Sequence, residues 1–353
     1  MKNINLLSKI CSVAGAPGYE KKIRDFIIGE IKKDGLSYTL DNLGNLIVKI
    51  NGKKEKSIMV AAHMDEIGFV VKYIDEKGFV FFHPLGGFDP KTLTSQRVVI
   101  HGTQDVLGVM GSKPIHIMSP EDRKKTPKTE DYFIDTGLKK EELEKKISVG
   151  DPITRHSELI ELGHNINGKS LDNRASVFVL LQVLKKIKQP PYDIYGVFTV
   201  QEEVGLRGAS AASLLINPDF GFGLDTTIAF DTPGSAERDR VSQLGQGPCI
   251  KIMDSQTICD YRMVNYMKEI SKLKKIKTQL EILPAGATDT SPLQRMNPGG
   301  SIAGAISIPT RHIHQTIEMV NKSDFNLSEL IRSDVISYLI CKKIKYSFLD
   351  FND

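Results

Sequence analysis

Two histidines and several carboxylates lie where apolar segments of this chain end or begin, and these residue types bind divalent metals. Ionisable groups beside an apolar core are normally paired or bound to metal, because burying them alone is costly. The five sites are His63 with Asp65, Asp172, Glu202 with Glu203, Asp225 with Asp231, and His312 with His314. Imidazole and carboxylate ligands without cysteine suit zinc, cobalt or manganese.

Each site alone also has a structural explanation. Asp172 precedes a predicted helix and would fit its N-cap. His63 would fit a hydrogen-bonded core histidine, and Glu202 with Glu203 would fit a solvated charged turn. The combination favours metal binding, because solvated charges do not normally end strands as apolar as MVAA and VFTV.

The number of groups is sufficient for two metals and a base. Two metals that share a carboxylate need about five protein ligands, and another carboxylate must accept the proton of the attacking water. The acidic pair offers one residue for each task. Asp65 follows His63 by two residues, on the same strand face, and is expected to accept the hydrogen bond that fixes the imidazole tautomer.

The elements that must position these groups alternate between strands and helices. Apolar runs predict strands at 57–65, 193–203, 220–231, 248–253, 278–284 and 301–309. Amphipathic or apolar patterns predict helices at 19–33, 169–188, 261–275 and 323–344. The alternation predicts an α/β fold, in which ligand sites form at the carboxyl ends of strands, and four of the five sites follow that rule.

The chain between these elements changes character from residue 67 to residue 164. Short alternating runs are broken there by Gly and Pro at close intervals, which is typical of a small β-rich module. We therefore expect a catalytic domain made of residues 1–66 and 165–353, and an inserted domain at 67–164.

Composition excludes several kinds of partner. The 353 residues carry a net charge of only +4 with both signs interspersed, so we expect no nucleic-acid groove and no membrane-binding patch. No run reaches the roughly 18 apolar residues of a membrane span. The four cysteines have no zinc-site spacing, and no export signal precedes them, so the expected location is cytoplasmic.

Taken in order, eight segments resemble the M42 family of metallopeptidases, the glutamyl aminopeptidase-like and tetrahedral (TET) aminopeptidases. The segments are APGYE (16–20), DNLGNL (41–46), AAHMDEIGF (61–69), GKSLDNR (168–174), TVQEEVGLRGA (199–209), LDTTIAFDTPG (224–234), ATDT (287–290) and ISIPTRHIHQTIE (306–318). Each segment alone is unspecific, but the whole series covers nearly the entire chain. Ala287 stands where the family pattern has glycine.

The resemblance implies a role for each candidate. His63 and Asp225 would bind one metal, Glu203 and His314 the other, and Asp172 both. Glu202 would be the general base and Asp65 would orient His63, while His312 would be a neighbour of the site. The cofactors implied are two divalent ions per subunit, zinc or cobalt, with manganese as the alternative.

The resemblance also implies a fold, an assembly and a reaction. The fold would be a mixed-sheet zinc-aminopeptidase-like catalytic domain with an inserted β-rich PDZ-like domain used for subunit contacts. The chain would form a homo-oligomer, from a dimer to a tetrahedral dodecamer, and would remove N-terminal amino acids from short peptides.

Three other functions remain open at this stage. Paired carboxylates also cleave glycosidic bonds, but a glycosidase pair must lie on both sides of the bond, whereas Glu202 and Glu203 are neighbours expected to diverge on a strand. The chain also has no tryptophan on which sugars could stack. A non-enzymatic scaffold that binds peptide ends through its PDZ-like module is a second alternative. A deacylase acting on acylated amino acids would need the same metal site.

Overall fold

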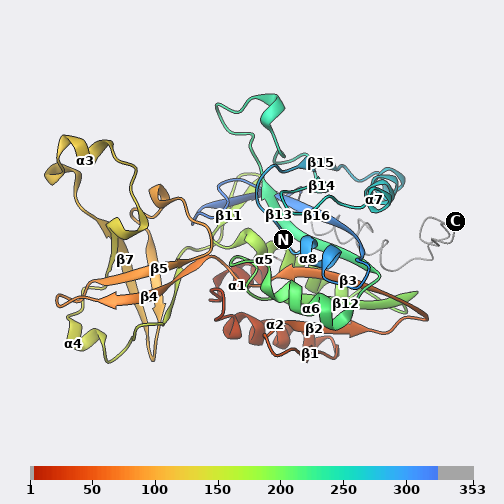
Figure 1. The fold of residues 1–353 in the computed structure, drawn as a ribbon, viewed down its shortest axis with the longest axis horizontal. Helices are drawn as coiled ribbons and strands as arrows, with labels where there is room; N and C mark the ends of the chain where they lie inside the picture. The colour runs from red at the N-terminus through yellow and green to blue at the C-terminus, as the bar shows by residue number, and fades with distance from the viewer. Residues whose placement is uncertain (1–3, 325–353) are drawn as a thin grey trace.

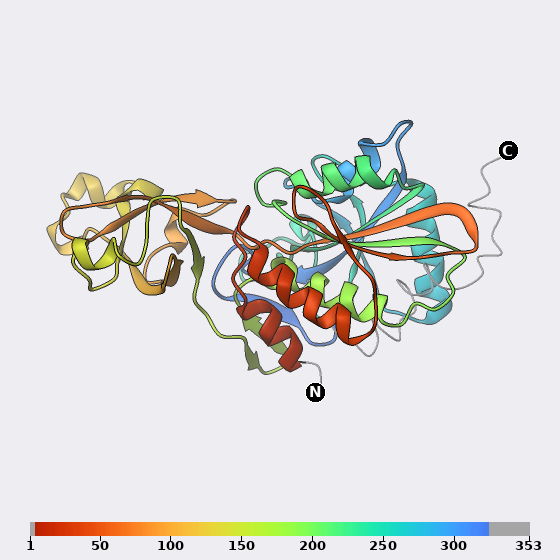
Figure 2. The same cartoon turned by 90° about the horizontal axis from the view of Figure 1, so that it is seen from below.

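The computed structural model describes residues 4–324. Figures 1 and 2 show a large α/β part and a smaller β part that projects from one side of it. The strands are β1 (Thr39–Leu40), β2 (Leu46–Ile50), β3 (Lys54–His63), β4 (Gly68–Ile74), β5 (Val80–Leu85), β6 (Arg97–His101), β7 (Asp105–Ser112), β8 (Tyr132–Asp135), β9 (Pro152–Arg155), β10 (Ile160–Leu162), β11 (Asn165–Gly168), β12 (Tyr192–Thr199), β13 (Phe220–Ile228), β14 (Cys249–Met253), β15 (Gln279–Ile282), β16 (Ile302–Thr310) and β17 (Glu318–Asn321).

The helices of the described residues are fewer than the strands. They are α1 (Ile4–Ser12), α2 (Lys21–Lys33), α3 (Pro120–Lys124), α4 (Lys140–Leu143), α5 (Leu171–Leu184), α6 (Arg207–Ile216), α7 (Tyr261–Lys274) and α8 (Thr290–Arg295). Within residues 4–324, none of them has the length and apolar character needed to cross a membrane.

The large part is built on an eight-stranded mixed sheet with the order β1-β2-β12-β3-β13-β16-β14-β15. The central strands β12, β3, β13 and β16 run parallel, so their carboxyl ends meet at one edge. β2 and β14 pair antiparallel to their neighbours in this centre. The predicted α/β fold with a mixed sheet is therefore confirmed.

Helices cover both faces of this sheet. Alternate residues of β3 point to opposite faces, as the period of a strand requires. Val60 and Ala62 belong to the core that α1, α2, α5 and α7 form on one face, and Met59 and Ala61 pack on the other face with α6 and α8. Burial on both faces explains why β3 and β12 are apolar over their carboxyl-terminal halves, where their residues are buried.

The small part is a closed barrel with the strand order β4-β5-β8-β7-β6-β9. It has its own apolar core, which includes Phe69, Val98, Ile100, Ile134 and Ile153. The barrel strands extend from Gly68 to Arg155, inside the range 67–164 that the sequence indicates for the insertion.

A third sheet joins the end of the insertion range to the large part. β10 lies within 67–164, but it pairs with β11, and β11 pairs in turn with β17. This sheet, α6 and α8 were not predicted from the sequence. The helix predicted at 323–344 lies outside the described residues from 325 onward.

Candidate metal centre

His63 is the last residue of β3 and is almost fully buried, with 2% of its side chain exposed. Its Nδ1 lies 3.2 Å from the backbone oxygen of Asp65, a distance at which Nδ1–H donates to that carbonyl. Nε2 then carries the lone pair, and it lies 3.4 Å from Asp172 Oδ1 and 3.6 Å from Asp225 Oδ1. The chain turn after β3 thus fixes the tautomer that a metal ligand needs.

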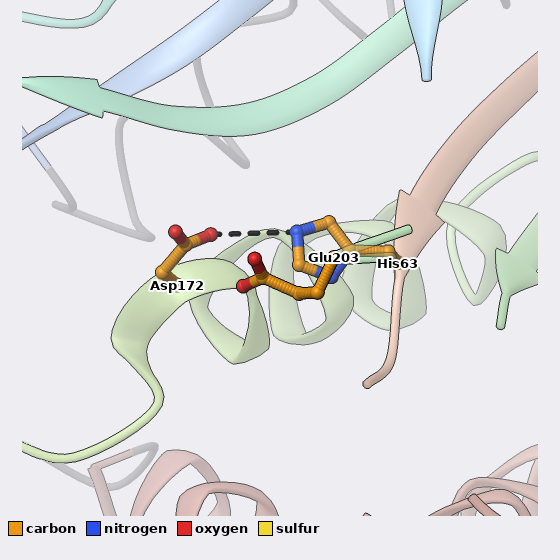
Figure 3. A group of neighbouring side chains, drawn as sticks. All are labelled: His63, Asp172 and Glu203. Carbon is orange, nitrogen blue, oxygen red and sulfur yellow. Dashed lines mark ion pairs between the residues drawn. The ribbon is translucent and has the colours of Figure 1, made fainter. Parts of the chain in front are cut away.

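Asp172 lies between the two histidines of the cluster. Its Oδ1 faces His63, and its Oδ2 is 3.3 Å from His314 Nε2. Asp172 does not cap α5, because Ser170 occupies the N-cap position and Asp172 has non-helical backbone angles within the first turn. The N-cap explanation for Asp172 is therefore wrong. Figure 3 shows Asp172, Glu203 and His63 with their polar ends directed at one another.

Glu202 and Glu203 lie in a turn after β12, which ends at Thr199. The expectation that they diverge on a strand is wrong, since both side chains line the same cavity. Glu202 Oε2 lies 3.9 Å from His63 Nε2, and Glu203 Oε2 lies 3.4 Å from His314 Nε2. The Asp65 carboxylate holds this turn by accepting the backbone N–H groups of Glu202 and Glu203, each at 3.1 Å.

Close packing between the backbones of Gly208 and Val200 supports the turn that carries Glu202 and Glu203. The N–H of Gly208, in the first turn of α6, donates to Val200 O at 3.0 Å. The side chain of Asn45 bonds both segments, accepting from Val200 N and donating to Gly208 O. A Cβ at position 208 would lie 2.3 Å from Val200 O, so only glycine fits there.

Asp225 and His314 complete the cluster from two other elements. Asp225 lies inside β13, three residues before its last residue, Ile228. His314 follows β16 in a turn and is 33% exposed, whereas His63 is 2% exposed. The cluster therefore has one buried end at His63 and one end that reaches the opening of the cavity at His314.

Crowding raises the proton affinity of Glu202 and Glu203, whereas contact with His314 and His63 lowers the pKa of Asp172. Burial and repulsion from Asp225 and Glu203 raise the pKa of Glu202 well above its ordinary value. Burial also raises the pKa of Glu203 to about 8. Although burial opposes it, contact with Glu203 and Asp172 raises the pKa of His314 to about 9. In the absence of cations, this crowding of acids stabilises bound protons.

The cluster fits divalent cations. Two sets of groups within it have ligand atoms close enough to hold an ion: His63 with Asp172 and Glu203, and His63 with Glu202 and Asp225. Among the described residues, the buried atoms Asp172 Oδ1 and Glu203 Oε1 have no hydrogen-bond donor. Buried carboxylate oxygens without donors are costly unless a cation balances them, and the nitrogen and oxygen donor set suits zinc, cobalt or manganese.

The other residues singled out in the sequence lie differently. Asp231 forms an ion pair with Arg311, with Oδ1 2.5 Å from Nε, and so has a structural role. His312 lies two residues before His314 and is not among the residues that line the cavity. The Asp65 side chain is 3.5 Å from His63 Nδ1, and its shorter bonds go to the turn at 202–203.

Sequence reasoning missed Glu318, which is fully buried behind the cluster. Its Oε2 accepts the backbone N–H of Asp172 at 2.9 Å and its Oε1 accepts that of His314 at 3.1 Å. The barrel residue Arg155 approaches Oε1 to 3.6 Å. Glu318 lies in the segment ISIPTRHIHQTIE, but nothing in the sequence indicates these partners.

Asp289 is a second buried acid that the sequence did not reveal. Its Oδ2 accepts the hydroxyl of Thr199 at 2.5 Å, at the end of β12. Burial raises the pKa of Asp289 to about 7. Its place in the segment ATDT was the only signal available.

Comparison with known proteins identifies the family. The family model described as M42 glutamyl aminopeptidase matches residues 44–330. A curated relative from Acetivibrio thermocellus is 39% identical, over 91% of this chain and 94% of its own length. The lysyl aminopeptidase of Pyrococcus furiosus is 30% identical, over 92% of this chain and 94% of its own.

Solved structures give the same result. A TET aminopeptidase from a marine-sediment thaumarchaeon has a TM-score of 0.92 and 32% identity, and the match covers 99% of this chain and 98% of that one. The TET1 peptidase of Pyrococcus horikoshii, which can assemble into a tetrahedron or a large octahedral shell, has a TM-score of 0.85 and 30% identity, over 96% and 99% of the two chains. This chain belongs to the M42 family of aminopeptidases.

Proposed function

We propose that this chain is a metal-dependent aminopeptidase that removes N-terminal amino acids from short peptides at a dinuclear centre. The observation that carries the proposal is the position of Asp172, whose two oxygens lie 3.4 Å and 3.3 Å from the ring nitrogens of His63 and His314. One carboxylate between two imidazoles is the arrangement that a bridging ligand requires. Asp225 would complete the His63 side and Glu203 the His314 side.

Two divalent ions, zinc or cobalt in the first instance, would supply Lewis-acid activation of water and of the scissile carbonyl. Glu202 lines the cavity beside His63 and is the proposed general base. A carboxylate within reach of the attacking water suits the role of proton acceptor. It would take the proton of the attacking water and return it to the leaving amine, while Asp65 holds the turn that carries it.

The proposal includes the assembly and its location. The barrel within 67–164 would be the PDZ-like domain that forms subunit contacts, and residues 1–66 with 165–353 would be the catalytic domain. Exposed Leu107, Ile115 and Ile117 give the barrel an apolar surface that supports this role. A homo-oligomer, from a dimer to a tetrahedral dodecamer, would restrict the centre to short peptides. The described cysteines are free thiols, which suit the cytoplasm.

The test is hydrolysis of a panel of aminoacyl-p-nitroanilides with and without a chelator, followed by readdition of zinc or cobalt. Release that stops with chelator, returns with metal and is absent from N-acetylated substrates is the expected result. Release of acetate, without release of p-nitroaniline, from the N-acetylated substrates would support an N-acyl hydrolase in place of this proposal.

Glu202→Gln tests the base. We expect turnover to be lost while two ions per chain remain bound, as counted by elemental analysis. The exposed Glu237→Gln variant carries the same chemical change and should keep normal turnover. Normal turnover by Glu202→Gln would rule out the assigned base.

A further inference from the structure

The cavity at the metal centre has a volume of about 400 Å³ and must hold the first residue of the peptide. Its ionisable lining residues are the six members of the cluster: His63, Asp172, Glu202, Glu203, Asp225 and His314. All other residues that line the described cavity are neutral. The substrate side chain must therefore lie against neutral groups once it passes the metal ligands.

Most of these neutral groups come from two segments. Thr226, Thr227 and Ile228 continue β13 beyond Asp225. Leu283 and residues 285–288 lie in the loop between β15 and α8. Gln256, in the loop after β14, adds an amide to the lining.

We call the neutral residues that line the cavity the wall. The charged groups behind this wall are already paired. Lys251 is fully buried, with Nζ 3.2 Å from Asp254 Oδ2 and 3.1 Å from Glu281 Oε1. Asp254 also accepts the N–H groups of Gln256 and Thr257 and the hydroxyl of Thr288. None of the three charged residues lines the cavity, so none offers a free partner to a substrate charge.

One further cation lies near the cavity without lining it. Arg295 is exposed, and its guanidinium donates to Gln256 Oε1 at 3.3 Å and to Ser291 Oγ. Gln256 thus stands between Arg295 and the cavity.

We infer that the enzyme prefers peptides whose N-terminal residue has a neutral, predominantly apolar side chain such as leucine or methionine, and discriminates against glutamate and lysine. The inference rests on the proposed aminopeptidase function and adds the substrate class. An apolar side chain gains free energy by leaving water for this wall, whereas a charged one loses hydration without gaining a partner. The preference differs from the glutamyl specificity in the family's description and from the lysyl specificity of the relative from Pyrococcus furiosus.

The experiment compares kcat/KM of the metal-loaded enzyme for Leu-, Met-, Glu- and Lys-p-nitroanilide. We expect the two neutral substrates to exceed both charged ones by at least about 100-fold, because the charged side chains are desolvated without partners. Competitive inhibition by free L-leucine, L-glutamate and L-lysine gives a second readout and should follow the same order.

A charge placed in the wall should reverse part of this preference. Ala287→Asp puts a carboxylate in the lining and should raise the ratio of Lys to Leu cleavage by at least about tenfold. Ala236→Asp makes the same change at an exposed position and should leave the ratio unchanged. If Ala287→Asp fails to fold, Gln256→Glu combined with Arg295→Met places an unpaired carboxylate in the lining by a nearly isosteric change at Gln256.

The outcomes separate this inference from the function on which it rests. Release from no substrate, free or acetylated, would overturn the proposed function and the inference with it. Release from the Glu or Lys substrate at the rate of the Leu substrate would overturn the inference alone. If the favoured substrate were Glu and Arg295→Met removed that activity, Arg295 would be the specificity residue and the neutral pocket would be refuted.

Discussion

Glu318→Gln should weaken metal binding although Glu318 is not a ligand. Its two oxygens hold the backbone N–H groups of Asp172 and His314, the proposed bridging ligand and a ligand on the open side. Glutamine keeps one acceptor oxygen but places an NH₂ group where the other oxygen stood, so one of these two N–H groups loses its acceptor. A hydrogen bond to a charged group contributes about 1.5–3 kcal/mol. Loss of one ligand-orienting contact therefore predicts roughly 10- to 100-fold weaker binding.

The assay is competition for zinc against a chromophoric chelator at constant pH. Glu161→Gln, which makes the same change at an exposed residue of β10, is the matched control and should bind zinc normally. Wild-type affinity in Glu318→Gln would refute the claim that Glu318 positions the ligands.

Stability must be separated from positioning in this experiment. Glu318→Gln also removes the anion 3.6 Å from Arg155, whose side chain is 1% exposed. An uncompensated buried charge costs about 3–5 kcal/mol, so the variant should unfold at a lower temperature. The double variant Arg155→Met with Glu318→Gln removes that charge. It should recover thermal stability without recovering zinc affinity, and recovery of both would assign the effect to folding.

Three further predictions follow from the same contacts. Zinc affinity of the metal-free protein should fall as pH decreases from 9 to 6. His314, with a pKa of about 9, and Glu203, with a pKa of about 8, must lose protons to bind the metal. Calorimetric titrations at several pH values would measure the affinity, and an affinity independent of pH would contradict the prediction. Lys169→Met removes the ammonium 2.7 Å from the buried Glu66 but leaves Arg174 at 3.7 Å, so the fold should lose only about 1.5–3 kcal/mol in chemical denaturation, as for one hydrogen bond to a charged group. Lys185→Met, at a partly exposed pair with Asp34, should cost less than about 1 kcal/mol. Gly208→Ala should displace the turn of Glu202 and Glu203 and lower kcat. The control Gly29→Ala, where a Cβ meets nothing within 4 Å, should preserve kcat and stabilise α2 by up to about 1 kcal/mol. Equal kcat in both variants would show that the turn tolerates the added methyl group.

The sheet was predictable because its central strands are buried on both faces. β3, β12, β13 and β16 therefore have long apolar runs, and such runs need no partner information to be recognised. The sheet of β10, β11 and β17 has the opposite character. The three residues of β10 are all exposed, and β11 pairs with residues 318–321 from the far end of the described chain, so no local pattern indicates it.

The candidate site was predictable to the extent that its groups interrupt apolar segments. His63, Asp172, Glu203, Asp225 and His314 are contributed by separate segments of the chain, and the structure brings their polar ends within a few ångströms of one another. The sequence could not predict the buried residue that positions these ligands. Glu318 binds backbone groups, and backbone N–H groups carry no sequence signal. Its role depends on the close approach of residues 172, 314 and 318, which only the folded chain establishes.

The separate origin of these ligands has a thermodynamic consequence. His63 ends β3, Asp172 opens α5, Glu203 follows β12, Asp225 lies in β13 and His314 follows β16, so no local segment contains the centre. An unfolded chain cannot present it, and cations that bind only the folded state stabilise that state by mass action. Free zinc at about 100 times its dissociation constant should therefore add about 2.7 kcal/mol to the free energy of unfolding, and chelator should remove it. The gain should be smaller in Glu318→Gln at the same zinc concentration. An equal gain in both proteins would mean that the zinc responsible binds elsewhere.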